Sequence, residues 1–534
     1  MRNLLRLIGR FRNDRRGNLA VIFTLAAIPL VSALGSAVDY SMATRMRAKL
    51  QSAADSASVA SISQNSAGYL AATQMQSDGT IAAGVTDANA IFDGNMNTIN
   101  GYQNLTRTST VTKTGIKLKS VVTFSAQVPT TFMRVIGMQA LTITGTSSSA
   151  ASLPPYLDFY LMLDVSGSMG LPSTDAEQTR LSKINPDDFS VYPNGCTFAC
   201  HFQTNACSNP SVGQKTNPSG SVVSAYPTNN YCLGYLISRV SQAGYNSLLQ
   251  PTANYPMKGV QLTAAILANA NSSLTPGAPN SLITGNSKSL PSSLTPVTSC
   301  PNEGADACIQ LRADAVGYAV TQLFQYANTH EKVSNQFRIG LYPFVRYLYA
   351  YFPLTSSIGP SDSITTAANN LATLLDPGNN SNLGSGGTHF ENAFPSMNTT
   401  ITSVGNGSTS TNTQPYVFLI TDGAQNFQTQ WGGGWSGSNS ATVMPSGTSS
   451  PCKPLRDRGI TVSVLYIPYQ TIQNPTTIFN NEDNVANANI PNIPPSLTDC
   501  ASSGFFYTAN TPADIQSALK AMFDHAVQTA HITN

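Results

Sequence analysis

Three side chains with hard oxygen atoms follow a short apolar run and could hold a divalent cation. They are Asp164, Ser166 and Ser168, which form a D-x-S-x-S sequence. The apolar run before them, residues 157–163, is typical of a buried parallel strand, and α/β sheets bind ligands at the carboxyl ends of such strands. Mg²⁺ takes about six oxygen ligands. The two hydroxyls could bind it directly, and the aspartate would supply negative charge through a water molecule.

Two further loops supply groups of the same kind. Thr388 ends a G-G-T sequence before a helical stretch, and Asp422 stands in a T-D-G sequence after the apolar run 416–420. A serine-rich chain can contain D-x-S-x-S by chance. The three sequences together, in this order, are a specific indication of a metal site. The alternative is that these residues form turns and cap helices. We predict a metal site made of Asp164, Ser166, Ser168, Thr388 and Asp422.

Alternating apolar runs and helical stretches must position these residues. Such alternation predicts an α/β domain with a doubly wound, mostly parallel sheet, here over residues 155–534. Within it, an insertion at about 170–311 is rich in Pro, Asn, Ser and Thr. The expected strands are 157–163, 337–345, 416–420, 460–467 and 504–507, and the expected helices are 312–332 and 512–532.

The N-terminal region is typical of a membrane anchor. Six arginines stand in the basic arm 1–17, and an uncharged, mostly apolar run covers 18–38. A helix of that length spans roughly 30 Å, the thickness of a bilayer core. The positive-inside rule keeps the arm in the cytoplasm and translocates the rest. A cleaved signal peptide is the alternative, but the helical pattern continues into 39–66, so we predict a retained transmembrane helix with a helical stalk.

Residues 78–152 have a different pattern. The stretches 116–124 and 141–148 alternate apolar and polar residues and are rich in β-branched side chains, which predicts strands. Between them, 128–138 is expected to form a short helix or turn. We predict a small β-rich module that acts as a spacer.

The run RRGNLAVIFTLAAIPLVSALGSAVDYSMATRMRAKLQSAADSASVA, residues 15–60, resembles the N-terminus of TadE/TadG-like proteins of the tight-adherence (Flp) pilus system. In that family a basic stretch, Arg-Gly, an apolar span, Val-Asp-Tyr and an Ala-rich helix follow one another. Processed pilin-like members carry a Glu five residues after the Gly, whereas Ile22 stands there in this chain. The resemblance is therefore to the unprocessed, TadG-like branch.

The five predicted ligands resemble the metal-ion-dependent adhesion site (MIDAS) of von Willebrand factor A domains. The resemblance implies that Ser166, Ser168 and Thr388 ligate the metal and that Asp422 completes the shell. Mg²⁺ is the expected ion, with Mn²⁺ and Ca²⁺ as alternatives. A carboxylate of a protein partner would take the open position, which is a binding function and not a catalytic one.

Composition and cysteine usage indicate an extracytoplasmic domain. Charged residues make up only 10% of the chain, against roughly 25% in soluble proteins, and a net charge of +2 gives no reason to expect nucleic-acid binding. An even number of cysteines after the span suggests up to four disulfides. Cys452 and Cys500 could pair with each other; zinc or haem binding at 196–201 is the alternative for that segment. The cysteines are Cys196, Cys200, Cys207, Cys232, Cys300, Cys308, Cys452 and Cys500.

These patterns predict a single-span protein of the bacterial inner membrane with a periplasmic or extracellular ectodomain. We expect it to be a metal-dependent, protein-binding component of Flp pilus assembly, whose partner presents an acidic residue and belongs to the pilus or envelope machinery. A stand-alone surface adhesin is the first alternative. The second is a periplasmic metal-dependent hydrolase with His389 as general base. We predict no enzyme, since the sequence shows no G-x-S-x-G, H-E-x-x-H or P-loop.

Overall fold

The computed structural model divides the chain into two compact units. One comprises residues 1–154 with 332–334, and the other comprises 155–331 with 335–534. Four of the cysteines, Cys196, Cys200, Cys207 and Cys232, lie outside the described residues, as does most of the insertion at 170–311. The structure describes residues 16–182, 212–216, 222–227, 238–243, 297–375, 381–384, 386–426, 429–431, 434–436, 442–469, 471 and 478–533.

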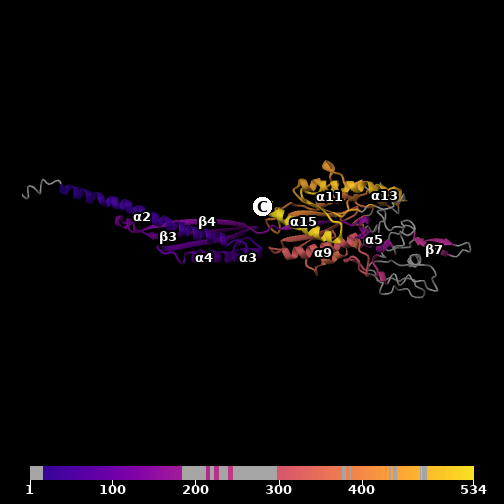
Figure 1. Cartoon of the computed structure of the whole chain (residues 1–534), viewed down its shortest axis with the longest axis horizontal. Helices are drawn as coiled ribbons and strands as arrows, with labels where there is room; N and C mark the ends of the chain where they lie inside the picture. Colours follow the sequence, from indigo (N-terminus) through magenta and orange to yellow (C-terminus); the bar gives the residue numbers. More distant parts are fainter. Residues whose placement is uncertain are drawn as a thin grey trace, which may run out of the picture. The chain divides into compact units, whose positions relative to one another are not determined.

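The first unit combines one long helix with an antiparallel sheet (Figure 1). Helix α2 (Arg16–Ala60) has 45 residues and packs against strands β3 and β4 and helix α4. The sheet has the order β1-β2-β3-β4, and the 3₁₀ helix η1 (Met133–Ile136) connects its last two strands. The remaining elements are α3 (Ala67–Gln74), β1 (Gly79–Thr80), α4 (Ala82–Met96), β2 (Gln103–Thr114), β3 (Lys117–Pro129) and β4 (Ala140–Ser152).

The second half of α2 is part of this unit because small and hydroxyl-bearing side chains let it approach the sheet closely. Leu50, Ala54 and Ala57 are fully buried. Ser58 Oγ lies 2.9 Å from Ser147 Oγ, and Ser61 Oγ lies 2.9 Å from Ser120 Oγ. The segment expected as a helical stalk is therefore helical only to Ala60, and it packs on strands instead of standing alone.

Helix α4 is an element of the region 78–152 that the sequence analysis did not predict. Its buried positions Gly84, Ala88, Phe92 and Met96 recur every four residues, which is the helical period. The expected short helix or turn within 128–138 is present as η1.

Among the described residues, one helix is long and apolar enough to cross a membrane, the stretch Leu25–Ala60 of α2. The large apolar side chains that the structure describes before residue 35 of this stretch are exposed: Leu25 is 67% exposed and Leu34 is 64% exposed. A helix whose apolar side chains are exposed is typical of a segment that faces lipid.

The second unit is built on a six-stranded sheet with the order β16-β15-β10-β5-β8-β9. All neighbouring pairs are parallel except the edge pair β8–β9. The predicted doubly wound, mostly parallel sheet is thus confirmed, and each of the five expected strands is present. The strands are β5 (Leu157–Asp164), β8 (Phe337–Phe344), β9 (Phe352–Thr355), β10 (Gln414–Thr421), β15 (Thr461–Tyr466) and β16 (Phe506–Thr508).

Helices cover both faces of this sheet, with α11 and α13 on one side and α9 on the other (Figure 1). Helix α9 packs against α15, and the ring of Phe159 in the central strand lies 5.1 Å from the ring of Phe523 in α15. The α-helices among the described residues of this unit are α5 (Asp175–Ser182), α9 (Arg312–His330), α10 (Ser363–Asn369), α11 (Phe390–Thr400), α12 (Lys453–Asp457), α13 (Ile478–Asn489), α14 (Ile493–Cys500) and α15 (Pro512–Thr533).

Two disulfides lie among the described residues of this unit. The expected pairing of Cys452 with Cys500 is present and ties the start of α12 to the end of α14. Cys300 pairs with Cys308 shortly before α9. Short hairpins complete the described parts: β6 (Val212–Thr216) with β7 (Val222–Pro227), β11 (Ala424–Gln425) with β14 (Thr442–Val443), and β12 (Thr429–Trp431) with β13 (Gly434–Ser436).

Candidate metal centre

The five predicted ligands meet at the carboxyl edge of the parallel sheet. Strands β5 and β10 are neighbours, so Asp164 at the end of one and Asp422 just after the other come to the same edge. Thr388 stands before α11 in a loop that reaches this edge. All five side chains belong to buried residues, with exposed fractions of 1% for Asp164, 1% for Ser166, 6% for Ser168, 3% for Thr388 and 0% for Asp422.

The hydroxyl groups are joined directly. Ser166 Oγ lies 3.1 Å from Ser168 Oγ, and Thr388 donates to Ser166 Oγ at 2.9 Å. Asp164 holds the turn in place, because its Oδ1 accepts the backbone N–H of Ser166 at 3.0 Å. Three hydroxyl oxygens from two loops, 222 residues apart in sequence, are thus gathered in one buried cluster.

Thr421 is a site residue that the sequence analysis missed. Its hydroxyl donates to Asp164 Oδ2 at 2.6 Å and accepts the backbone N–H of Gly423 at 2.9 Å. It orients the carboxylate and shapes the turn that carries Asp422. The signal was available, since Thr421 is the first residue of the T-D-G sequence that identified Asp422.

Two buried carboxylates face each other in this cluster, and their charges are poorly tolerated. Burial, together with the charge of Asp422, raises the pKa of Asp164 to about 7. Burial also raises the pKa of Asp422, although the guanidinium of Arg312 opposes that rise. A bound divalent cation would relieve this repulsion, because a nearby positive charge favours the ionised form of both acids.

The donor set fits a hard divalent cation. Asp422 Oδ1 is buried and has no hydrogen-bond partner among the described residues, and a buried charged oxygen left unpaired is costly. No group of three or more His, Cys, Asp or Glu side chains gathers in the described part of the chain. The candidate site offers hydroxyl oxygens and two carboxylates, which are donor types that hard divalent cations accept.

Arg312, at the start of α9, is an unexpected neighbour of the site. Its Nη1 lies 3.4 Å from Asp422 Oδ2, and its guanidinium stacks 5.2 Å from the ring centroid of Tyr469. The Arg312 side chain is only 8% exposed. Because it already offers a positive charge to Asp422, Arg312 would compete with a cation that used this carboxylate.

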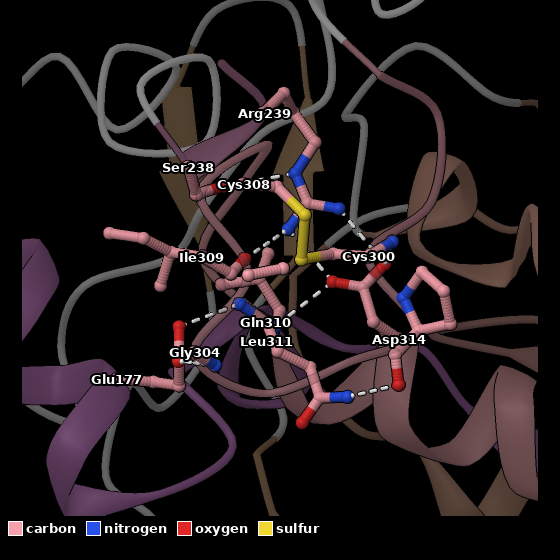
Figure 2. The surroundings of a disulfide bond; sticks show 12 residues. Glu177, Ser238, Arg239, Cys300, Gly304, Cys308, Ile309, Gln310, Leu311 and Asp314 are labelled. Atoms are coloured by element: carbon pink, nitrogen blue, oxygen red, sulfur yellow. Dashed lines mark hydrogen bonds and ion pairs between the residues drawn. A yellow bond between two sulfur atoms is a disulfide. The ribbon is translucent and has the colours of Figure 1, made fainter. Parts of the chain in front are cut away.

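A rigid network holds the start of α9 (Figure 2). Asp314 accepts the backbone N–H groups of Cys300 and Leu311 and receives two hydrogen bonds from Arg239, at 2.9 and 2.8 Å. The side chains of Arg239 and Asp314 are fully buried. The Cys300–Cys308 disulfide lies beside them, so the position of Arg312 two residues before Asp314 is firmly set.

We expect Arg312→Gln to bind Mg²⁺ roughly tenfold more tightly than the wild type. A charge pair at about 4 Å is worth about 4 kcal/mol at an effective dielectric constant of 20, and removing the guanidinium frees part of that energy for the metal. Titration calorimetry of the metal-free chain measures the change. Arg338→Gln is the matched control, since Arg338 pairs with Asp158 near the amino ends of β8 and β5. Unchanged or weaker binding in Arg312→Gln would show that Arg312 does not compete.

His389, the candidate general base, stands at the N-cap of α11 beside Thr388. It is 3% exposed, and its Nδ1 lies 2.6 Å from Glu391 Oε1. Glu391 in turn accepts a hydrogen bond from Gln425 at 2.7 Å. The imidazole is therefore engaged in a side-chain network that links the start of α11 to strand β11.

The described α/β unit has a doubly wound, mostly parallel sheet with a cluster of buried oxygen atoms at its carboxyl edge. Solved structures similar to parts of this chain include a von Willebrand factor domain and a protein with a MIDAS motif. The vWF domain of the pilus tip protein Mfa5 from Porphyromonas gingivalis is 13% identical, with 42% of this chain and 89% of that chain covered and a TM-score of 0.24. Proximal thread matrix protein 1 from the mussel byssus, solved with a zinc-occupied MIDAS motif, is 16% identical, with 40% and 43% covered and a TM-score of 0.23.

The pilus adhesin SpaC from Lactobacillus rhamnosus GG is 10% identical, with 80% of this chain and 34% of that chain covered and a TM-score of 0.30. The chain thus spans less than half of the byssus protein and about a third of SpaC. Because these TM-scores are low, the fold class rests on the strand order itself. No curated protein matches the chain.

The N-terminal segment identifies the family resemblance. Residues 17–64 match the model of the family described as putative Flp pilus-assembly TadE/G-like. The match covers all of α2 except Arg16, and so includes both the candidate span and the part of α2 that packs on the sheet. The resemblance predicted from the sequence is therefore confirmed for this segment.

Proposed function

We propose that this protein is a membrane-anchored component of Flp pilus assembly that binds a protein partner through a divalent cation. The family match supports the pilus role. The buried oxygen cluster is the main support for the proposed binding role. In it, Asp422 Oδ1 has no hydrogen-bond partner among the described residues. A binding protein needs no catalytic base, so we propose that it is not an enzyme.

The side chains would hold the cation as follows. The cation would be bound by the hydroxyl oxygens of Ser166, Ser168 and Thr388 and by a carboxylate oxygen of Asp422. Asp164 would supply further negative charge next to these ligands. When bound, the cation would attract an acidic group, since hydroxyl ligands neutralise it less than carboxylates would. Mg²⁺ is the proposed ion, with Mn²⁺ or Ca²⁺ as alternatives.

The proposed location follows from the N-terminal segment. The basic arm 1–17 would remain in the cytoplasm, and α2 would cross the bacterial inner membrane. The α/β unit would then lie in the periplasm or outside the cell, where the Cys452–Cys500 and Cys300–Cys308 disulfides are stable. The partner would be a protein of the pilus or envelope machinery that presents an Asp or Glu side chain.

Affinity capture with the full-length chain tests this function. We expect pilus or envelope proteins to be captured in Mg²⁺, lost in EDTA, and lost with Ser166→Ala/Ser168→Ala. Ser396→Ala is the matched control, because Ser396 is exposed on α11 and bonds only within its helix. Capture that persists in EDTA would contradict the proposal.

The same variants separate the alternatives. Metal-dependent binding to host or matrix proteins without any pilus protein would favour a stand-alone adhesin. Metal-dependent turnover of a substrate, abolished by His389→Ala, would favour a periplasmic hydrolase.

A further inference from the structure

The connection between β3 and β4, residues 130–139, carries exposed apolar side chains. We call this segment the β3–β4 tip. Val135 is 75% exposed, Ile136 is 55% exposed, Met138 is 44% exposed and Phe132 is 40% exposed. Water-exposed apolar groups gathered on one turn usually mark an interaction site.

The tip is bound to α2 near the end of the apolar run 18–38. Asp39 accepts the backbone N–H groups of Thr131, Phe132 and Met133 at 3.0, 2.9 and 2.7 Å. Phe132 lies directly on Gly35, where an added Cβ would come within 2.3 Å of the Phe132 Cβ. Gly35 is four residues before Asp39, or about 6 Å along the helix, so the tip reaches the last turn of the apolar run 18–38.

The burial of α2 locates the same boundary. Its stripe of buried residues begins at Gly35 and continues through Asp39, Ala43 and Met46. Before Gly35, the described side chains of the helix are largely exposed and mostly apolar, as lipid contact requires. The tip is therefore the part of the folded unit that stands next to the bilayer when α2 spans it.

The residues of the tip are suited to the membrane interface, where the apolar lipid layer meets the headgroups. Several of its backbone N–H groups are satisfied within the tip: Val135 donates to Phe132, Gly137 to Arg134 and Met138 to Met133. Satisfied backbone groups are what a segment needs to enter lipid without a large cost. Residues 130–139 contain no acidic side chain, and the exposed Arg134 stands among the apolar ones, where it could meet lipid phosphates.

We propose that the β3–β4 tip is an interfacial anchor that inserts its apolar side chains into the ectodomain-side leaflet of the membrane that α2 crosses. This inference rests on the proposed membrane span. A second attachment beside the span fixes the tilt and rotation of the first unit, because an amphipathic turn in the interface resists both. Asp39 is the positioning residue that joins the span to this anchor.

Quenching of tryptophan fluorescence by brominated lipid tests the proposal. Full-length protein with Trp431→Phe/Trp435→Phe is reconstituted into phosphatidylethanolamine–phosphatidylglycerol vesicles whose acyl chains carry bromine near the headgroups. Val135→Trp then reports on the tip and Leu30→Trp on the span. Lys119→Trp is the control, because Lys119 is exposed on β3, roughly 35 Å from its end.

We expect a bromine-dependent loss of fluorescence for Val135→Trp and Leu30→Trp and none for Lys119→Trp. Loss for Leu30→Trp alone would overturn the anchor while leaving the span intact, and an unquenched but blue-shifted Val135→Trp would mean that a protein covers the tip instead. Absence of quenching at both Val135→Trp and Leu30→Trp would overturn the anchor and the proposed span together.

Discussion

Asp314→Ala will destabilise the α/β unit by about 3–5 kcal/mol, the usual effect of removing one partner of a buried ion pair. The substitution leaves the fully buried Arg239 guanidinium without its carboxylate. It also removes the acceptor of the backbone N–H groups of Cys300 and Leu311. Urea unfolding of the full-length chain in detergent measures the loss. The chain has only 2 tryptophans, Trp431 and Trp435, and both belong to the α/β unit.

The control for this prediction is Asp457→Ala. Asp457 pairs with Lys453 on the surface, where the two side chains are 59% and 42% exposed. Pairs of this kind contribute about 1 kcal/mol or less. If the two variants lost similar stability, the buried network of Figure 2 would not be what holds the start of α9.

Removal of the Cys452–Cys500 disulfide is the second change with a large expected effect. The bond closes a loop of sequence separation 48, and the chain-entropy relation gives about 4 kcal/mol for such a loop. We expect Cys452→Ala/Cys500→Ala to lose about that much stability in the same urea experiment. Substitution is preferable to a reductant, which would also act on the chain's other cysteines.

Cys300→Ala/Cys308→Ala is the matched comparison. Its bond closes a loop of sequence separation 8, for which the same relation gives about 2.5 kcal/mol. The long-loop variant should therefore be the less stable of the two. The reverse order would mean that strain or the surroundings of Cys300, and not loop entropy, decide these contributions.

The sheet was predictable because its strands are short, continuous apolar runs bounded by polar turns. Residues 157–163 became β5, whose eight residues are all buried, and the ends of parallel strands necessarily meet at one edge. That geometry is why five residues spread from Asp164 to Asp422 could be assigned to one cluster. Thr421 went unnoticed although it lies within the same sequence, because a threonine before an aspartate is common in turns.

Other features depend on contacts that no short pattern encodes. Arg312 contacts Asp422 across a sequence separation of 110. The position of Arg312 at the start of a helix does not predict this contact. Helix α4 was missed because its sequence, AAGVTDANAIFDGNM, contains glycine, asparagine and aspartate, which favour turns. Packing of Gly84 against Gly68 and Val111 stabilises it as a helix, and sequence periodicity alone did not show that contact.

The most direct test of the account is the metal dependence of stability in the full-length chain stripped of metal with EDTA. A cation that binds only the folded form stabilises it by about 2.7 kcal/mol at 100 times its Kd. We predict that adding Mg²⁺ raises the unfolding temperature of the wild type, followed by tryptophan fluorescence, and leaves Ser166→Ala/Ser168→Ala unchanged. An unchanged wild type, or an equal rise in both proteins, would contradict the metal site at Ser166, Ser168, Thr388 and Asp422.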